Sequence, residues 1–253
     1  MLLTDGLPND TEALRVYESG VLDVSNMEGI DLVVKLHLAL AEISEDVLDI
    51  LLSHSTDMVA MLRRTKGVSD VVVSPQMKRW HALHTLEVFY RDAFNNQLND
   101  RYQVKSLEYQ ELARAARLHT VRFGIGLVNN PIPRADVPQV SFTIGTPSAA
   151  SYYIQVSWVS ATGQEGDPSL LMAFDGGVNQ VPVIQAVDPP VGAVGFNVYA
   201  SLTPTTLALQ NSSPVAVGGS FTLNQSGPVS GPAPGNGQAP DSYITGGSTV
   251  IRG

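Results

Sequence analysis

The spacing of apolar residues changes from a helical period to a strand period near residue 134. Before that point apolar residues recur every three or four positions, which predicts helices. Ser74 followed by Pro75 is a typical helix start, because Ser can cap the free amides and Pro lacks only a donor that is unpaired there anyway. The expected helices cover 9–19, about 27–52, 55–66, 75–98 and 101–122. The first half therefore predicts a bundle of four or five helices.

Beyond residue 150 the period becomes two. Tyr152, Ile154, Val156 and Trp158 alternate with more polar neighbours, which predicts a strand with one buried face. Further strand candidates recur with Gly, Pro or Asn between them, a spacing typical of an antiparallel sandwich. They cover 170–174, 181–187, 194–201, 206–210, 215–217, 220–223, 241–245 and 250–251. The Gly/Pro/Ser-rich stretch 226–240 predicts a long surface loop.

Composition places a boundary between these two halves. Residues 1–134 hold 14 of the 15 Lys and Arg, whereas residues 135–253 hold 16 of the 22 Gly and 12 of the 16 Pro. Pro131 and Pro133 forbid helix in the residues before them and predict an extended linker. We therefore predict an α+β protein with separate domains. These are a helical domain at 1–128, a Pro-rich linker at 129–137 and an antiparallel, immunoglobulin-like β-sandwich at 138–253.

Charge and cysteine content exclude several classes of protein. The formal net charge of −9 disfavours a general polyanion binder. The absence of cysteine excludes disulfides, thiolate metal sites and a Cys nucleophile. Met1 to Asp10 lacks the apolar run of a signal peptide, and the apolar-rich stretch Ile30 to Leu52 contains six charged residues. We expect a soluble protein without a membrane span.

The sequence offers little that resembles a reaction centre. His81, His84 and Glu87 have the spacing of metal ligands on a helix, but the stronger zinc signature His-Glu-x-x-His is missing. A helix face with two part-exposed histidines is the preferred interpretation. The chain has no Gly-x-Ser-x-Gly elbow and no phosphate-binding glycine loop. We expect no enzyme activity, no catalytic residue, no metal and no cofactor.

The helix predicted at 101–122 carries apolar residues on two faces. Tyr102, Tyr109, Leu112 and Ala116 share one face, and Leu107, Leu118 and Val121 lie on another. Such a helix is buried on both sides, either within one subunit or between subunits. Because Arg is enriched in protein interfaces, its row of arginines strengthens the second alternative. The candidate interface residues are Arg114, Arg117, Val121, Arg122, Phe123, Ile125 and Arg134.

Two segments of the helical half resemble the head–tail connector (adaptor) proteins of tailed bacteriophages. The first runs from Trp80 to Phe94 and contains Phe89-Tyr-Arg-Asp-Ala-Phe94, and the second runs from Asp100 through Tyr102 and Tyr109 to Arg117. The second half separately resembles the immunoglobulin-like or fibronectin-III-like modules of phage structural proteins. That likeness lies in the alternation after Tyr153, in Gly163-x-Glu165-x-x-Pro168 and in Gly195-Phe-Asn-Val-Tyr-Ala-Ser201.

The resemblance implies a structural virion protein of the phage neck. Such a protein forms a ring of identical subunits, twelve-fold by resemblance, that is assembled in the host bacterial cytoplasm. The ring docks on the portal protein, receives tail or neck proteins, and lets DNA pass without sequence-specific binding. We expect the portal-facing contact within Val121 to Arg134. The open alternative is a neck-fibre, tail or decoration protein whose β domain binds a partner protein or a host glycan, with Trp158 and Tyr199 as aromatic candidates.

Overall fold

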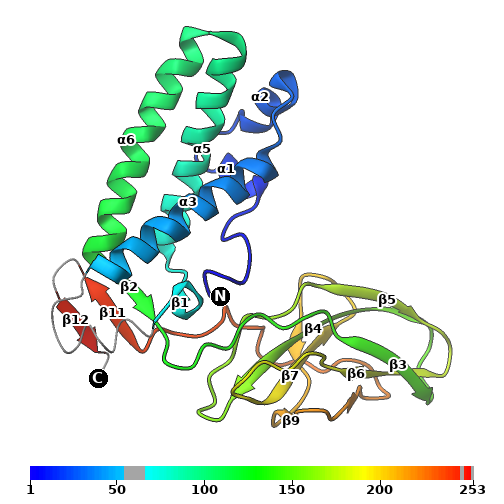
Figure 1. Cartoon of the computed structure of the whole chain (residues 1–253). Coiled ribbons are helices and arrows are strands. Elements are labelled where there is room, and N and C mark those ends of the chain that lie inside the picture. The colour runs from blue at the N-terminus through cyan, green and yellow to red at the C-terminus, as the bar shows by residue number, and fades with distance from the viewer. Residues whose placement is uncertain (54–65, 246–247, 252–253) are drawn as a thin grey trace. The chain divides into compact units, whose positions relative to one another are not determined.

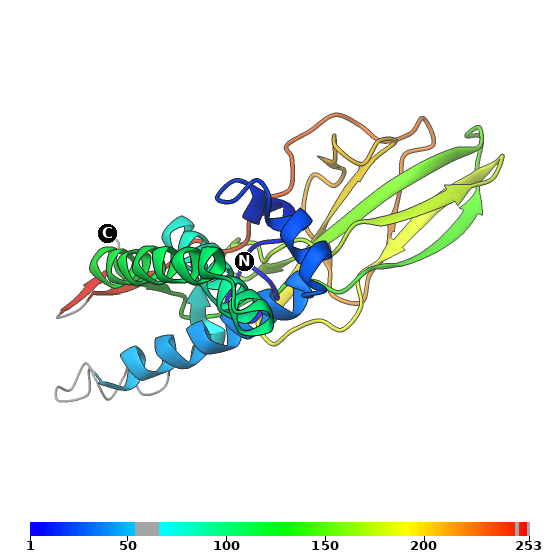
Figure 2. The same cartoon turned by 90° about the horizontal axis from the view of Figure 1, so that it is seen from above.

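The computed structural model describes residues 1–53, 66–245 and 248–251 (Figures 1 and 2). The protein belongs to the α+β class, with helices in the N-terminal half and antiparallel sheets in the C-terminal half. None of the described helices combines the length and apolar character that a membrane crossing requires.

Contacts group the chain into two compact units. The helical unit comprises Gly6–Asn129 and Pro240–Gly253, and the β unit comprises Met1–Asp5 and Asn130–Ala239. The predicted ranges 1–128 and 138–253 placed the first five residues with the helices and the last fourteen with the strands. The contacts instead group the first five residues with the β unit and the last fourteen with the helical unit.

The helical unit is built on a long hairpin of two helices, α5 and α6, which lie side by side (Figure 1). Leu98 adopts a left-handed conformation between them, and the Asn99 side chain caps α6 by accepting from the amide of Arg101 at 3.0 Å. Helix α3 packs against α5. The helices are α1 (Thr11–Arg15), α2 (Val21–Glu28), α3 (Leu32–Ser53), α5 (Pro75–Gln97) and α6 (Asp100–Phe123), with a 3-10 turn η1 (Val68–Asp70).

Local sequence signals explain most of these helices. The Ser74 hydroxyl accepts from the amide of Met77 at 3.2 Å, as expected for the cap of α5. The apolar stripe of α3 is buried as predicted, with Leu36, Ala39 and Ile43 all at 1% exposure or less. Helix α2 was not predicted, because Gly20 looked like a helix end and instead precedes a second short helix. The helix predicted at 55–66 lies, apart from Lys66, outside the described residues.

A small antiparallel sheet closes one end of the helical unit. Its strand order is β1 (Val71–Val72), β2 (Ile125–Leu127), β11 (Ser242–Thr245) and β12 (Ser248–Ile251). The sequence showed Gly124 and Gly126 only as helix breakers, so strand β2 was missed. A Cβ atom at Gly126 would lie 2.6 Å from the Pro240 ring, which explains why glycine stands there.

The β unit contains two antiparallel sheets that contribute to one hydrophobic core. The first sheet has the order β10 (Phe221–Thr222), β6 (Gln180–Gln185), β3 (Gln139–Ile144). The second has the order β5 (Met172–Gly176), β4 (Ala150–Ser160), β7 (Ala193–Ser201), β8 (Ala208–Leu209), with β9 (Val215–Ala216) also paired to β7. Trp158 and Phe196 meet edge to face in this core at 5.9 Å. Strand β3 was not predicted.

The predicted loop at 226–240 contains no strand or helix, and its residues are mostly exposed. It is fixed near its end by Gln238, whose side chain is buried. The Gln238 carbonyl oxygen accepts from the amide of Ile132 at 2.5 Å, and its amide donates to the Asn130 carbonyl at 3.0 Å and to Gln164 at 2.8 Å.

Candidate functional site

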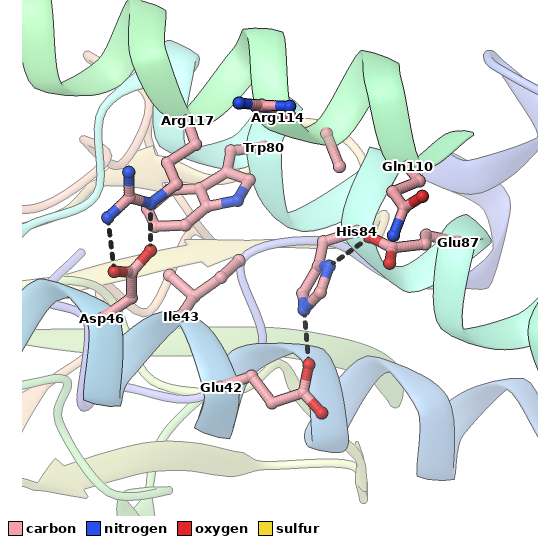
Figure 3. A pocket seen from close by; sticks show the side chains of 10 residues that line it. Glu42, Ile43, Asp46, Trp80, His84, Glu87, Gln110, Arg114 and Arg117 are labelled. Atoms are coloured by element: carbon pink, nitrogen blue, oxygen red, sulfur yellow. Dashed lines mark hydrogen bonds and ion pairs between the residues drawn. The ribbon is translucent and has the colours of Figure 1, made fainter. Parts of the chain in front are cut away.

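A cavity of about 290 Å³ lies in the helical unit between α3, α5 and α6 (Figure 3). Its charged groups are three carboxylates, two guanidinium groups and one imidazole. The lining consists of Glu42, Ile43, Asp46, Trp80, His84, Glu87, Gln110, Ala113, Arg114 and Arg117. Each of the three helices contributes at least two of these residues, so the cavity depends on the tertiary packing.

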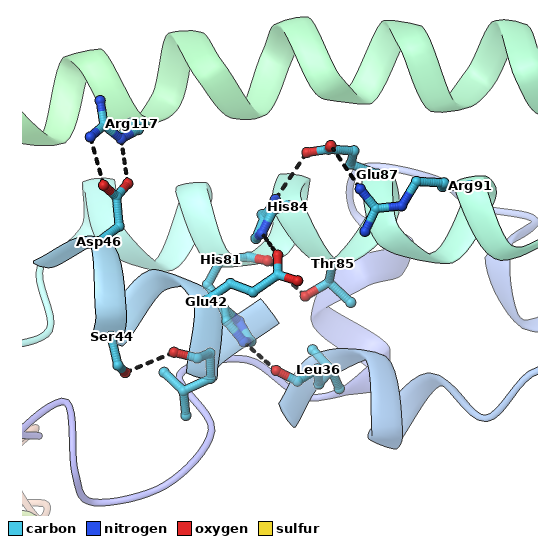
Figure 4. A network of polar contacts seen from close by, with 11 residues as sticks. Leu36, Glu42, Ser44, Asp46, His81, His84, Thr85, Glu87, Arg91 and Arg117 are labelled. Carbon is cyan, nitrogen blue, oxygen red and sulfur yellow. Dashed lines mark hydrogen bonds and ion pairs between the residues drawn. The ribbon is translucent and has the colours of Figure 1, made fainter. Parts of the chain in front are cut away.

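His84 bridges two helices at the cavity. Its Nδ1 lies 2.9 Å from Glu87 on α5, and its Nε2 lies 2.6 Å from Glu42 on α3 (Figure 4). Burial alone would lower the pKa of His84, but the hydrogen bonds with Glu87 and Glu42 outweigh it and the pKa lies above its ordinary value of 6.5. Because both partners are acceptors, both ring nitrogens donate when the imidazole is protonated. His84 is then a cation held between two carboxylates.

Arg117 joins α6 to α3 in a second ionic contact. Its Nη2 donates to one carboxylate oxygen of Asp46 at 2.6 Å, and its Nε donates to the other. The hydrogen bond with Asp46 raises the pKa of Arg117. This two-point geometry is the strongest that Arg and a carboxylate form, so Asp46 fixes the rotamer of Arg117.

The spacing of His81, His84 and Glu87 does not produce a convergent set of ligands. Nε2 of His81 donates to the Leu36 carbonyl at 3.0 Å, and Nδ1 accepts from the Asn9 amide at 3.0 Å. His81 is fully buried, and burial lowers its pKa to about 4. Its ring is a neutral core group turned away from the cavity. Within the described residues, no group of three or more His, Asp or Glu side chains is arranged to hold a metal ion.

The charges around the cavity balance. Three carboxylates face protonated His84 and the two arginines, and of the three cations only Arg114 makes no ion pair with another described residue. No hydroxyl, thiol or amine group stands among the lining residues, so the polar groups of the lining are the carboxylates, the two guanidinium groups, the imidazole, the indole of Trp80 and the amide of Gln110. What this arrangement does is hold α3, α5 and α6 together and leave one arginine available for an external partner.

Outside the cavity, helix α6 presents an apolar face to solvent. Val104, Leu107 and Leu118 are 65%, 56% and 57% exposed, whereas Tyr102 and Tyr109 on the opposite face are buried against α5. The sequence predicted two apolar faces on this helix, and in the single chain only one is covered. Leu112, assigned to the buried face, is 37% exposed.

The predicted interface residues fall into three groups. Arg114, Arg117, Val121, Arg122 and Phe123 lie together along the second half of α6, where Phe123 is 63% exposed. Ile125 is buried in β2, opposite Ile244. Arg134 belongs to the β unit.

In that unit Arg134 is already bound. Its Nη2 lies 2.5 Å from Asp167, and its amide donates to Asp5 at 2.8 Å. Burial raises the pKa of Asp5. A cavity of about 300 Å³ adjoins these residues, lined by Thr4, Asp5, Pro133, Arg134, Ala135, Asp136, Val137 and Leu170. Within the β unit, Arg134 therefore holds together Asp167, through its guanidinium group, and Asp5, through its backbone amide.

Sequence reasoning missed the acidic partners on α3. Glu42 and Asp46 are four residues apart and therefore lie on one side of the helix, facing His84 and Arg117. That spacing was the available signal, but it does not say which helix lies opposite.

Both aromatic candidates for glycan binding are buried. Trp158 is 1% exposed and Tyr199 is 3% exposed, and the Tyr199 hydroxyl donates to Glu165 at 2.6 Å. Neither ring is accessible to a sugar.

Comparison with known proteins adds no assignment: no protein-family model matches the chain, and no curated protein shows significant similarity to it.

Proposed function

We propose that this protein is a structural component of a tailed-phage neck, a head–tail connector whose copies form a ring at the portal vertex. The ring extends the DNA channel and joins head to tail. The observation that carries the proposal is the exposed apolar face of α6, formed by Val104, Leu107 and Leu118. The resemblance of the α5–α6 segment to phage adaptor proteins is the reason for assigning this face to a ring contact.

Ring formation needs two different faces on each subunit, because a closed ring is built from head-to-tail contacts. The α6 face supplies one, with Arg114 and Arg122 beside it. A net charge of −9 suits a channel through which DNA slides without adhering.

We also propose that the two units are separate domains, a helical bundle and an immunoglobulin-like sandwich. In support, the core of the β unit draws on both of its sheets, with Ile154 and Trp158 from β4 and Ile184 from β6. In this proposal the β unit is an outward module that contacts a neighbouring virion protein.

The test uses the full chain, alone and mixed with the portal protein of the virus that encodes it. Light scattering and negative-stain microscopy should show closed rings, either free or on the portal. A monomer or trimer that ignores the portal would contradict the proposal and favour the neck-fibre, tail or decoration alternative.

A point substitution tests where the portal contact lies. Within the expected segment Val121 to Arg134, Phe123 is 63% exposed, so Phe123→Asp should abolish docking without loss of fold. Val178→Asp is the matched control, because Val178 is 66% exposed in the β unit. Docking should be measured by co-sedimentation with the portal, and undiminished docking of Phe123→Asp would place the contact elsewhere.

A further inference from the structure

We propose that the outward face of α3 in one copy packs, in parallel orientation, against the outward face of α6 in the next copy. The occupant of each face is thus a second copy of this chain. This inference rests on the proposed ring and names the surfaces that close it.

The outward face of α6 lies opposite its buried face. Successive residues turn by about 100°, so Val104, Leu107, Leu118 and Arg122 fall on the side of the helix away from the residues packed on α5. Glu111 and Ala115 lie between them on the same side and are exposed.

Helix α3 carries a similar face. Val34, Leu38, Leu48 and Leu52 lie opposite its buried stripe and are 56%, 41%, 39% and 53% exposed. Glu45 is exposed in the middle of this row. The outward face of α3 therefore consists of the apolar pair Val34 and Leu38, the apolar pair Leu48 and Leu52, and Glu45 between the two pairs.

The two faces cannot cover each other within one chain. Helix α3 and helix α6 each direct the buried face toward α5, so their outward faces point away from the bundle. Two unlike faces on one subunit are what a head-to-tail contact requires.

The spacing of the apolar residues matches between the faces. Leu38 and Leu48 are separated by ten residues on α3, and Leu107 and Leu118 by eleven on α6. At the rise of a helix these separations are about 15 Å and about 16.5 Å. Leu38 can therefore meet Leu107 while Leu48 meets Leu118.

Charge selects the parallel orientation. In parallel packing with these two leucine pairs, Glu45 lies opposite Arg114, and Arg122 lies one turn beyond Asp49. In antiparallel packing Glu45 would instead lie opposite Glu111, and two carboxylates repel each other.

The charges of the two helices are complementary over their second halves. From residue 42 onward α3 has four carboxylates and no Lys or Arg, and after Glu111 helix α6 has three arginines and no carboxylate. Asp46 and Arg117 already pair within the chain. Glu45, Asp49, Arg114 and Arg122 form no ion pair with another described residue, so these four remain for contact between copies.

A charge-swap experiment on the full-length protein tests the contact. The acidic-face variant is Glu45→Lys with Asp49→Lys, and the basic-face variant is Arg114→Glu with Arg122→Glu. Each alone should weaken self-association on the order of a hundredfold, because it places like charges opposite each other. A 1:1 mixture of the two, and the variant with all four changes, should restore assembly, because every contact is again between opposite charges.

Matched controls separate this effect from folding and net charge. Asp23→Lys with Asp136→Lys changes the net charge by the same amount as the acidic-face variant, at exposed positions outside both faces, and should assemble as the wild type does. Circular dichroism should show unchanged helix content in every variant. Assembly is measured by sedimentation velocity of the protein alone and by electron microscopy of the protein on the portal.

Cysteine cross-linking tests the orientation, because the natural chain has no cysteine. Copies with Leu48→Cys mixed with copies with Leu118→Cys should form a disulfide-linked dimer on oxidation. Copies with Leu48→Cys mixed with copies with Leu107→Cys should not, since that pair meets only in antiparallel packing. The reverse result would overturn the parallel arrangement.

The outcomes distinguish the two proposals. If the wild type assembles and both charge variants assemble equally well, or the four-substituted variant fails to recover, the α3–α6 contact is overturned while the ring stands. If the wild type associates neither alone nor on the portal, and no cross-link forms, both proposals fail.

Discussion

Replacing His84 should reveal how much the ionic clasp between α3 and α5 contributes to stability. The Glu87 side chain is 10% exposed, so its hydrogen bond to the imidazolium contributes about 1.5–3 kcal/mol. The Glu42 side chain is 41% exposed, and solvent screening limits that pair to about 0–1 kcal/mol. His84→Gln should therefore lower the free energy of unfolding by about 1.5–4 kcal/mol at pH 6, where the imidazole is charged.

The loss should depend on pH in a defined direction. The pKa of His84 is raised in the folded protein, so its contribution is complete below the unfolded value of 6.5 and disappears as the pH rises through the folded value. The groups that set this pKa are Glu42 on α3 and Glu87 on α5. Arg91 lies 3.8 Å from Glu87, and Arg114 and Arg117 line the cavity from α6.

Urea unfolding of the wild type and of His84→Gln, measured between about pH 5 and pH 9, gives the difference between their free energies of unfolding directly. The difference should shrink at alkaline pH, and taking the difference cancels the contributions of other titrating groups. A constant difference over this range would refute the assignment of a protonated clasp. Gln is chosen because it can still donate a neutral hydrogen bond, so the variant isolates the charge.

Three further predictions test the fold of the two units, one of them with Gly20→Ala as its control. His81 has a pKa lowered to about 4, so the wild type should lose stability as the pH falls from 6.5 toward 4, and His81→Gln should remove this acid sensitivity in urea titrations. Gly126→Ala should cost about 1–3 kcal/mol through its clash with Pro240, whereas Gly20→Ala, with nothing within 4 Å of the new Cβ, should be close to neutral in thermal melts. Trp158→Ala should destabilise the β unit by about 3–5 kcal/mol in denaturant titrations followed by near-ultraviolet circular dichroism, and a smaller loss would contradict its central place in that core.

The sequence predicted elements whose signals are local. The cap at Ser74 and the alternation around Trp158 each depend on a few neighbouring residues, and each was found where expected. The helical hairpin and the class of the protein follow from such signals.

Elements defined by distant partners escaped prediction. Strand β2 has three residues and exists because β1 and β11 pair with it, so no periodicity marks it in the chain. The clasp at His84 depends on Glu42, which is 42 positions away. Periodicity revealed both apolar faces of α6 but could not tell which face α5 would cover.

The division of the chain between its two units changes how they are connected. The predicted Pro-rich linker would be a single extended connection, but the boundaries at residues 5–6, 129–130 and 239–240 make three backbone crossings between the units. Three segments of the chain, rather than one, then bear a force that pulls the units apart. The sheet of the helical unit also closes only after residue 242 has been synthesised, since β11 must pair with β2. During translation all strands of the β unit are therefore synthesised before the last two strands of the helical unit.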